Sequence, residues 1–219
     1  MHFALPSISR ADFQAGLERL SPESLPEQAV DSLYAHYEEL SRWNQRVALI
    51  GPGTADEVLA RHFGESLAAL PLLSPDARVG VDVGSGAGFP GLVLAAARPW
   101  LEITLVEARE RKWSFLLSAV RKASLPCRCL NARVGVPLPA GLPETIDFVT
   151  ARALKLEPDV LQAFAKRLGP EGQILLWVGK EDPDLPPGLT PAGSVKLEGS
   201  ERRRILELRR SDSESAQIR

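Results

Sequence analysis

Residues 81–91 read VDVGSGAGFPG, and this stretch decides the fold of the chain. An apolar strand pattern precedes the glycines, and a helical pattern follows them. Glycine has no Cβ and tolerates positive φ, so a loop of this kind lets a ligand approach bare backbone. Glu107 ends the next predicted strand, where its carboxylate can accept both hydroxyls of a ribose. The loop alone could be a tight turn without a ligand, but together with Glu107 it predicts a site for a nucleoside-bearing cofactor.

Two kinds of cofactor compete for this loop. Gly86, Gly88 and Gly91 match G-x-G-x-x-G, the pattern of nicotinamide dinucleotide sites. The alternative pattern, D-x-G-x-G-x-G, starts at Asp82 and resembles the first motif of class I methyltransferases, which bind S-adenosylmethionine. Pro90 lies where a pyrophosphate needs free amide donors, and proline has no N–H. Because S-adenosylmethionine has no pyrophosphate, Pro90 favours a methyltransferase over an NAD-dependent oxidoreductase.

Strand and helix patterns alternate from residue 79 onward. This alternation predicts βαβ units and a parallel sheet that is covered on both faces. The Pro- and Gly-rich segment 182–193 is expected to be a loop, and 195–198 with 204–208 to return as an antiparallel hairpin pair. The expected strands are 79–83, 103–107, 126–130, 146–150 and 173–178, and the expected helices are 92–97, 113–122 and 160–168.

The residues before position 79 have helical patterns. Apolar groups at three-and-four spacing predict an amphipathic helix over 25–47, opened by Pro26. Thr54 and Glu57 form a capping-box pattern before a second helix over 58–70. The predicted division of the chain is a helical extension packed on the core at 1–75, a Rossmann-like domain at 76–210 and a frayed tail at 211–219.

The composition excludes several classes of protein. The 219 residues are 44% hydrophobic and 25% charged, as in an ordinary soluble protein, and no stretch is apolar enough to span a bilayer. Cys127 and Cys129 cannot easily bridge, which suits a reducing cytoplasm. The three histidines are scattered and offer no metal site. We therefore expect a cytoplasmic monomer that binds neither a membrane nor a metal.

The charge distribution bears on a nucleic-acid partner. The net charge is −2 and the pI is about 6.0, so the overall field would not attract a polyanion, and RNA binding must rely on local clusters. Each cluster taken alone could be a solvated face. The candidate clusters are Arg109, Arg111 and Lys112; Arg121 and Lys122; and Arg202, Arg203 and Arg204 with Arg209 and Arg210.

Landmarks beyond the loop extend one family resemblance from Leu40 to Leu208. They are Trp43-Asn44, Arg61-His62-Phe63, Glu65-Ser66, Arg133-Val134 and Thr150-Ala151-Arg152-Ala153. With the glycine loop, they resemble the bacterial small-subunit ribosomal RNA methyltransferase G family, also called glucose-inhibited division protein B. The resemblance implies an α/β class I methyltransferase fold, Rossmann-like, with a mostly parallel seven-stranded sheet. It also implies S-adenosylmethionine as cofactor and N7 of guanine 527 in 16S rRNA, free or in the small ribosomal subunit, as methyl acceptor.

The resemblance also implies roles for individual residues. Arg152 would lie beside the transferring methyl as the catalytic residue, although it could instead form a surface ion pair. His62 could equally be a helix-packing residue, and Trp43 is expected in the core rather than as a stacking platform for RNA. The residues implied for the cofactor are Gly84, Gly86, Gly88, Phe89, Glu107, Val134, Gly135 and Arg152. The candidate residues for RNA, which also draw on the basic clusters, are His62, Arg111, Lys180, Arg202 and Arg203.

Several positions depart from the family pattern. The departures touch the presumed acceptor side more than the cofactor side, so a noncatalytic RNA-binding protein with this fold is kept as an alternative. Ala48 and Ile50 replace Asn and Thr, Glu65 replaces Asp, Gly135 replaces Glu, and Val178-Gly179 replaces Lys-Gly, with Lys180 displaced by two positions.

The absence of an obvious catalytic dyad is compatible with the expected reaction. Guanine N7 has a free lone pair and no proton, so its methylation needs no general base. Alignment of the reactants and preorganised electrostatics would supply most of the acceleration. An Arg or Lys that hydrogen-bonds guanine O6 would orient the base, and the candidates are Arg152, Arg111 and Lys180.

Overall fold

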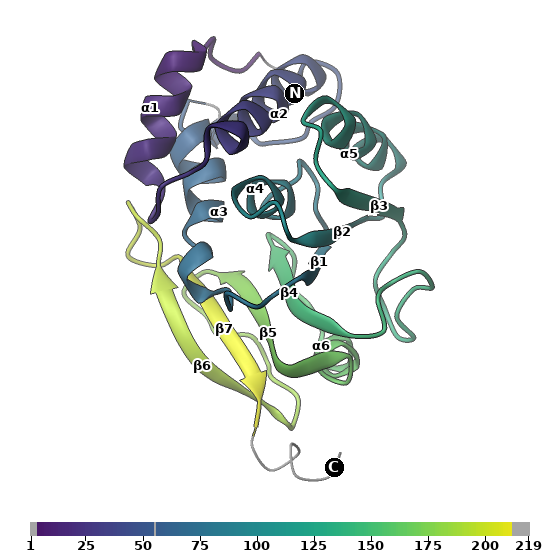
Figure 1. Cartoon of the computed structure of the whole chain (residues 1–219). Coiled ribbons are helices and arrows are strands. Elements are labelled where there is room, and N and C mark those ends of the chain that lie inside the picture. The colour runs from purple at the N-terminus through teal and green to yellow at the C-terminus, as the bar shows by residue number, and fades with distance from the viewer. Residues whose placement is uncertain (1–3, 55, 212–219) are drawn as a thin grey trace.

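The computed structural model describes residues 4–54 and 56–211, and its centre is a seven-stranded sheet (Figure 1). The strands are β1 Val79–Val83, β2 Glu102–Glu107, β3 Cys127–Asn131, β4 Ile146–Arg152, β5 Leu168–Val178, β6 Leu189–Lys196 and β7 Arg204–Arg210. Their order is β3-β2-β1-β4-β5-β7-β6. β1 to β5 pair in parallel, whereas β7 runs antiparallel to both β5 and β6. The predicted mostly parallel sheet is confirmed. The predicted tail lies outside the described residues, apart from Ser211.

Two predicted boundaries are wrong. The segment 182–193 was expected to be a loop, but β6 begins within it, at Leu189, and includes Pro191. β6 is an edge strand with one neighbour, and an edge tolerates a proline that cannot donate an N–H. The helix expected to continue to Leu168 ends at Ala165, because a glycine and a proline follow it, and Leu168 instead opens β5.

Helices cover both faces of the sheet, as a parallel sheet requires (Figure 1). One face packs against α4 Gly91–Ala97 and α5 Glu110–Lys122, and α2 Glu27–Asn44 packs on these two helices. The other face packs against α6 Pro158–Ala165. In β1, Val81 and Val83 join the apolar cluster on the α6 side. Asp82 lies between them and therefore points to the opposite face, toward α4, because side chains alternate along a strand.

The N-terminal segment is helical, as predicted, and shares the core of the sheet domain. Its elements are α1 Arg10–Leu20, α2, η1 Pro52–Thr54, η2 Leu59–Gly64, α3 Glu65–Leu67 and η3 Leu70–Leu72. Phe63 packs edge-on against Phe13 of α1 and against Phe89 of the glycine loop, with ring centroids 5.1 Å apart in both pairs. The N-terminal helices therefore support the loop directly.

The second predicted helix differs from its expected form. Within 58–70 the chain makes a π-helix, η2, and then a single turn of α-helix, α3. The capping box is wrong: the Thr54 hydroxyl donates to the Gly51 carbonyl at 3.1 Å, and no side chain caps η2. Thr54 closes a short 3-10 turn instead, so it lies too early in the chain to cap the helix.

Candidate functional site

The main pocket opens at the carboxyl ends of β1, β2 and β4 and has a volume of about 730 Å³. The strand order reverses here, since β2 lies on one side of β1 and β4 on the other. Ligands of open α/β sheets bind outside the strand ends at such a switch point. The glycine loop and the strand ends form one wall, and Ile50, Thr54, Arg61 and His62 from the N-terminal segment contribute another.

Asp82 braces the glycine loop from below. Its two carboxylate oxygens accept hydrogen bonds from the Thr150 hydroxyl at 2.8 Å and from the Gly91 N–H at 3.2 Å. The side chain is fully buried, and this burial raises the pKa of Asp82 to about 6. Asp82 thus connects β1, β4 and the first residue of α4, and it does not face the pocket as a free base.

The three glycines of the motif have two different roles. All have positive φ, at +71° for Gly84, +55° for Gly86 and +87° for Gly88, which other residues rarely adopt. Gly84 and Gly86 line the pocket, as expected. Gly88 is not among the lining residues, and a Cβ there would overlap the side chain of Leu92. Gly88 therefore allows α4 to pack closely under the loop.

Glu107 lies at the mouth of the pocket, at the end of β2. One carboxylate oxygen accepts the Gly86 N–H at 3.1 Å, and the other accepts the Arg109 N–H at 2.8 Å. A carboxylate oxygen has a second acceptor position, so both can still receive hydroxyl groups. Val134 lines the pocket nearby, whereas Gly135 does not. The backbone thus holds Glu107 in one orientation before any ligand arrives.

Arg152 ends β4 and is buried in the pocket wall. Its Nη2 donates to Glu65 Oε2 at 2.8 Å and to the Arg61 carbonyl, and its Nη1 donates to the His62 carbonyl at 3.4 Å. Burial lowers the pKa of Arg152 to about 10, so the group stays charged at neutral pH. These contacts use three of the five guanidinium N–H groups and leave Nε–H and one Nη1–H for a ligand, and Arg152 is one of the residues that line the pocket. Since its side chain is 13% exposed, Arg152 is not a surface ion pair.

Glu65 is the acceptor of a buried charge cluster that the sequence patterns did not predict. Its carboxylate pairs with Arg61 at 3.0 Å, with Arg152 at 2.8 Å and with Arg203. Its side chain is 6% exposed. The helical spacing of Arg61 and Glu65 was the only local signal, because Arg152 and Arg203 come from β4 and from the turn before β7. The cluster joins the N-terminal helices, the pocket and the C-terminal hairpin.

His62 lines the pocket as an uncharged group. Its ring stacks on Phe89 with centroids 5.1 Å apart and an interplanar angle of 28°, and its Nε2 lies 2.9 Å from the Thr54 hydroxyl. Burial, and then the charge of Arg152, lower the pKa of His62 to about 3. The imidazole is therefore neutral at physiological pH and does not attract phosphate by charge.

The other residues implied for RNA lie elsewhere. None of the four lines the main pocket: Arg111, Lys180, Arg202 and Arg203. Arg203 forms an ion pair with Glu65. Lys180 is exposed after the end of β5, and Arg202 is exposed before the start of β7. Arg109 and Lys112 do line the pocket, although the sequence indicated them only as members of a basic cluster. Among the departures from the family pattern, Ile50 lines the pocket and Ala48 is exposed outside it.

His36 lies under the glycine loop and is fully buried. Its Nε2 donates to the Ala87 carbonyl at 2.8 Å, and its ring lies among Phe63, Phe89 and Phe115. Burial lowers the pKa of His36 from 6.5 to about 4, although the hydrogen bond to Ala87 opposes the shift. The glycine loop is therefore supported by a hydrogen bond from a neutral imidazole.

We expect the free energy of unfolding to fall as the pH drops from 6.5 toward 4, and the His36→Phe variant to lose the part of this slope that His36 contributes. Between these values the unfolded chain binds a proton that folded His36 rejects, so acid favours unfolding. Over the full window, the titration of His36 lowers the free energy of unfolding by about 3 kcal/mol. Urea denaturation at several pH values in this window measures the slope. His62 titrates in the same sense as His36, and Asp82 in the opposite sense, but both are present in the parent and in the variant. Parallel profiles of the two proteins would therefore contradict the assignment to His36.

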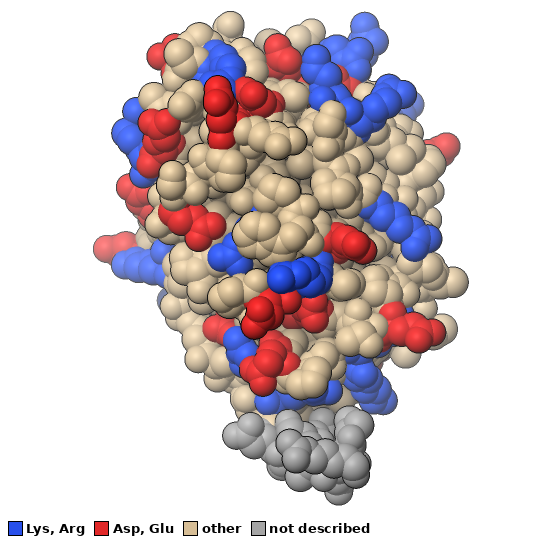
Figure 2. All heavy atoms as spheres, in the orientation of Figure 1, with Lys and Arg blue, Asp and Glu red and all other residues tan. Residues whose placement is uncertain are grey.

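The surface mixes charges of both signs. Figure 2 shows acidic and basic side chains interspersed over most of the visible face, with Lys and Arg gathered over α5 at the upper right. Within residues 4–54 and 56–211, no helix is long and apolar enough to cross a membrane. In the same ranges, no group of three or more His, Cys, Asp or Glu side chains is arranged to hold a metal ion.

The comparisons with known proteins identify the family. A family model described as rRNA small subunit methyltransferase G matches residues 29–184. The chain belongs to this family. The ribosomal RNA small subunit methyltransferase G of Paramagnetospirillum magneticum is 35% identical over 164 residues, which cover 74% of this chain and 77% of the relative. The methyltransferase G of a Jannaschia species is 40% identical over 141 residues, 63% of each chain.

Solved structures support the class I methyltransferase fold. The crystal structure of an S-adenosylmethionine-dependent methyltransferase from Aquifex aeolicus superposes with a TM-score of 0.53 at 18% identity, covering 70% of this chain and 92% of that one.

The antiparallel β7 between β5 and β6 departs from the dinucleotide-binding strand order 3-2-1-4-5-6. At α4, Asp82 takes the first amide, and Pro90 before it has none. The loop of this methyltransferase G family member is thus a poor pyrophosphate site.

Proposed function

We propose that this protein transfers a methyl group from S-adenosylmethionine to N7 of a guanine in 16S rRNA, with guanine 527 as the target that the family resemblance implies. Family membership supports ribosomal RNA as the acceptor. The observation that carries the proposal is the pocket at the strand switch point, which combines an exposed glycine backbone, a fixed carboxylate and a buried guanidinium. On this proposal the protein acts as a monomer in the cytoplasm, on free rRNA or on the small subunit.

The residues of the pocket fit an adenosine-bearing cofactor. Glu107 presents a carboxylate that two backbone amides orient, as recognition of a ribose diol requires. At Gly86 a Cβ would meet only the Gly84 carbonyl, at 3.6 Å, and the Lys112 ammonium, at 3.9 Å, so the backbone is open on the pocket side. Val134 supplies an apolar contact where the resemblance places the adenine. When bound, the cofactor would supply an electrophilic sulfonium methyl.

The chain itself needs no general base for this reaction. Guanine N7 attacks with its own lone pair, and no proton leaves the base in that step. The titratable groups of this region are poorly suited to act as a general base. His62 has a pKa of about 3, and the Asp82 carboxylate is engaged by the Gly91 N–H and the Thr150 hydroxyl. The work left to the protein is to orient the base and exclude water.

Arg152 is the side chain best placed to orient the guanine. Its remaining N–H groups can donate to guanine O6, and arginine cannot act as a base, so its role is positional and electrostatic. The carbonyls of Arg61 and His62 that accept its other N–H groups belong to η2, a π-helix, which is a local form that often occurs at functional sites. The scaffold thereby fixes the guanidinium plane before the acceptor binds.

The test of the proposal is methyl transfer to small subunits, or to their 16S rRNA, from cells that lack this protein. Labelled cofactor should place one methyl group on the RNA, and mass spectrometry of the digested nucleosides should identify N7-methylguanosine. Methylation at another atom would refute the N7 assignment. If the protein binds rRNA and cofactor but transfers nothing, the noncatalytic alternative holds. A thermal shift with NAD and none with S-adenosylhomocysteine would favour an oxidoreductase.

Glu107→Ala is expected to weaken binding of S-adenosylhomocysteine roughly tenfold to a hundredfold. The reason is the loss of hydrogen bonds to a charged acceptor, worth about 1.5 to 3 kcal/mol. Isothermal titration calorimetry measures the affinity. Glu110→Ala is the matched control, because Glu110 is an exposed acid on the first turn of α5 outside the pocket lining. Equal affinities for the parent and Glu107→Ala would make Glu107 an ordinary acid.

A further inference from the structure

A second groove lies between the end of α2 and the start of α5. Its volume is about 480 Å³. The two helices pack side by side in opposite directions, since Glu39 accepts a hydrogen bond from Ser118 at 2.6 Å and Trp43 packs against Phe115 one turn closer to the start of α5. The groove is lined by Arg42, Trp43, Gln45, Arg46, Val47 and Arg111.

The side chains of two arginines in this groove have no partner among the described residues. Within the described ranges, 4–54 and 56–211, neither Arg46 nor Arg111 forms an ion pair or a side-chain hydrogen bond, and both are exposed. Arg42 is paired with Glu39, but its side chain is still 68% exposed. The groove therefore has a net positive charge that the protein leaves uncompensated.

The groove and the main pocket both take basic residues from the start of α5. Arg111 lines the groove, while Arg109 and Lys112, on the same turn, line the main pocket. Cations near a helix N-terminus oppose its dipole and cost about 0.3 to 1 kcal/mol each at an exposed position. Glu110 on the same turn offsets one of these three cations, and no side chain caps the helix at Arg109. Cations that destabilise a helix N-terminus are expected where function requires positive charge at that place.

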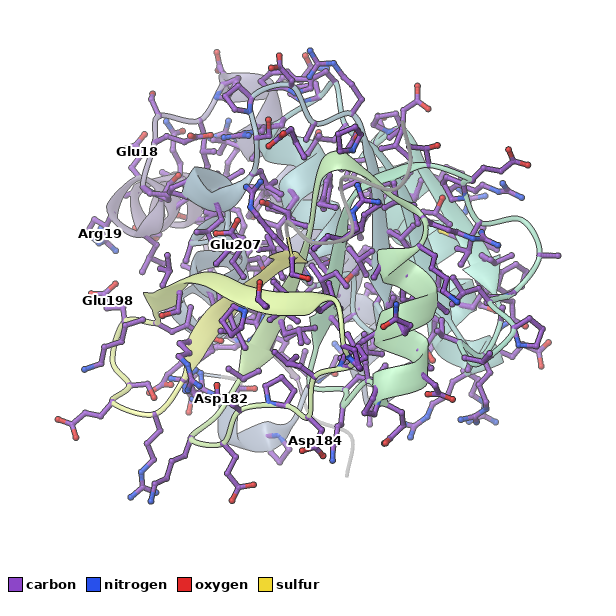
Figure 3. The ribbon with its side chains drawn as sticks, turned by 90° about the horizontal axis from the view of Figure 1, so that it is seen from below. Glu18, Arg19, Asp182, Asp184, Glu198 and Glu207 are labelled. Carbon is purple, nitrogen blue, oxygen red and sulfur yellow. The ribbon has the colours of Figure 1, made fainter. Side chains whose placement is uncertain are left out.

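The basic cluster at the C-terminal hairpin has a different character. Arg203 is engaged by Glu65, and Arg204 by Asp182 and the Gly179 carbonyl. Figure 3 shows Asp182 and Glu198 on the same side of the molecule as the hairpin. Most of the positive charge there is thus already neutralised, and a polyanion would have to displace these carboxylates.

We propose that the groove between α2 and α5 binds the ribose-phosphate backbone of the single-stranded RNA that flanks the target guanine. Arg46 and Arg111 would each contact a phosphate, and Trp43 would supply the apolar wall that nucleic-acid grooves commonly contain. The strand would then enter the main pocket past Arg109 and Lys112. This inference rests on the proposed function, because it assigns the RNA path to the same active site.

The experiment measures binding of a 16S rRNA fragment as a function of salt. In the Arg46→Ala/Arg111→Ala variant, affinity at low salt should fall about tenfold or more, and the slope of log K against log salt should become shallower by about 1.4, since each lost single-strand contact removes about 0.7. Calorimetry with S-adenosylhomocysteine should give the parent affinity, which shows that the variant is folded. At saturating RNA the single-turnover methylation rate should return to that of the parent.

The matched control is Arg19→Ala/Lys166→Ala, which removes two exposed basic side chains that lie outside both pockets and outside the basic clusters named from the sequence. It should leave the affinity and the salt slope unchanged. If the parent methylates rRNA but the groove variant binds it with the parent affinity and slope, the groove proposal is overturned and the proposed function stands. If the parent shows groove-dependent RNA binding without methyl transfer, the groove is supported and the proposed function fails.

Discussion

Glu65→Gln is expected to lower the free energy of unfolding by about 3 kcal/mol. Removing the acceptor from a buried ion cluster leaves uncompensated charge, which costs about 3 to 5 kcal/mol. The lower end applies because Arg61 and Arg203, at 30% and 25% exposed, can still reach water. Arg152, at 13% exposed, cannot do so easily. Urea denaturation at neutral pH measures the change.

Glu65→Asp is the matched control for this prediction. Aspartate keeps the charge but is one methylene shorter, so it should retain at least part of the ion pairing with Arg152 and cost less than Gln. A loss below about 1 kcal/mol in Glu65→Gln, the range of surface pairs, would show that the cluster does not hold the hairpin to the pocket. If Glu65→Gln lowers the free energy of unfolding more than Glu65→Asp does, the loss of charge dominates; the reverse order indicates an effect of packing.

Arg152→Ala is expected to lower the single-turnover rate of methyl transfer about a hundredfold at saturating cofactor. A preorganised donor that acts mainly in the transition state contributes about 2.7 kcal/mol, which corresponds to that factor. Affinity for S-adenosylhomocysteine should change by less than about threefold, because the proposed function assigns cofactor recognition to Glu107 and the glycine loop. Rapid-quench measurement with rRNA and calorimetry with the product give the two quantities.

Arg152→Lys should restore little of the rate. A lysine ammonium keeps the charge but lacks the planar fork that bonds the Arg61 and His62 carbonyls together with Glu65. Full rescue by Lys would mean that charge alone matters. If Arg152→Ala stays within about threefold of the parent rate, roughly 0.65 kcal/mol in barrier, Arg152 does not act at the site.

Features that depend on neighbouring residues could be predicted from the sequence. The glycine loop, its preceding strand and Glu107 at the end of β2 follow from short patterns, because backbone freedom and alternating burial are local properties. Their family resemblance, extended by landmarks such as Thr150–Arg152, identified the fold class correctly. Boundaries failed where tertiary position overrides local preference, as at Pro191, which is tolerated because β6 is an edge strand.

Which charged residues are free to bind RNA was decided only by the tertiary structure. Arg203 and Arg111 both belong to basic clusters in the sequence. In the folded chain Arg203 pairs with Glu65, which is distant in sequence, whereas Arg111 lines the same groove as Arg46. Gly88 matches the motif as well as Gly86 does, but the packing of α4 turns it away from the pocket. The sequence determined the fold and the glycine loop through local backbone chemistry. The partners of each charge depend on contacts between distant segments, because an ion pair forms only where the folded chain brings opposite charges together.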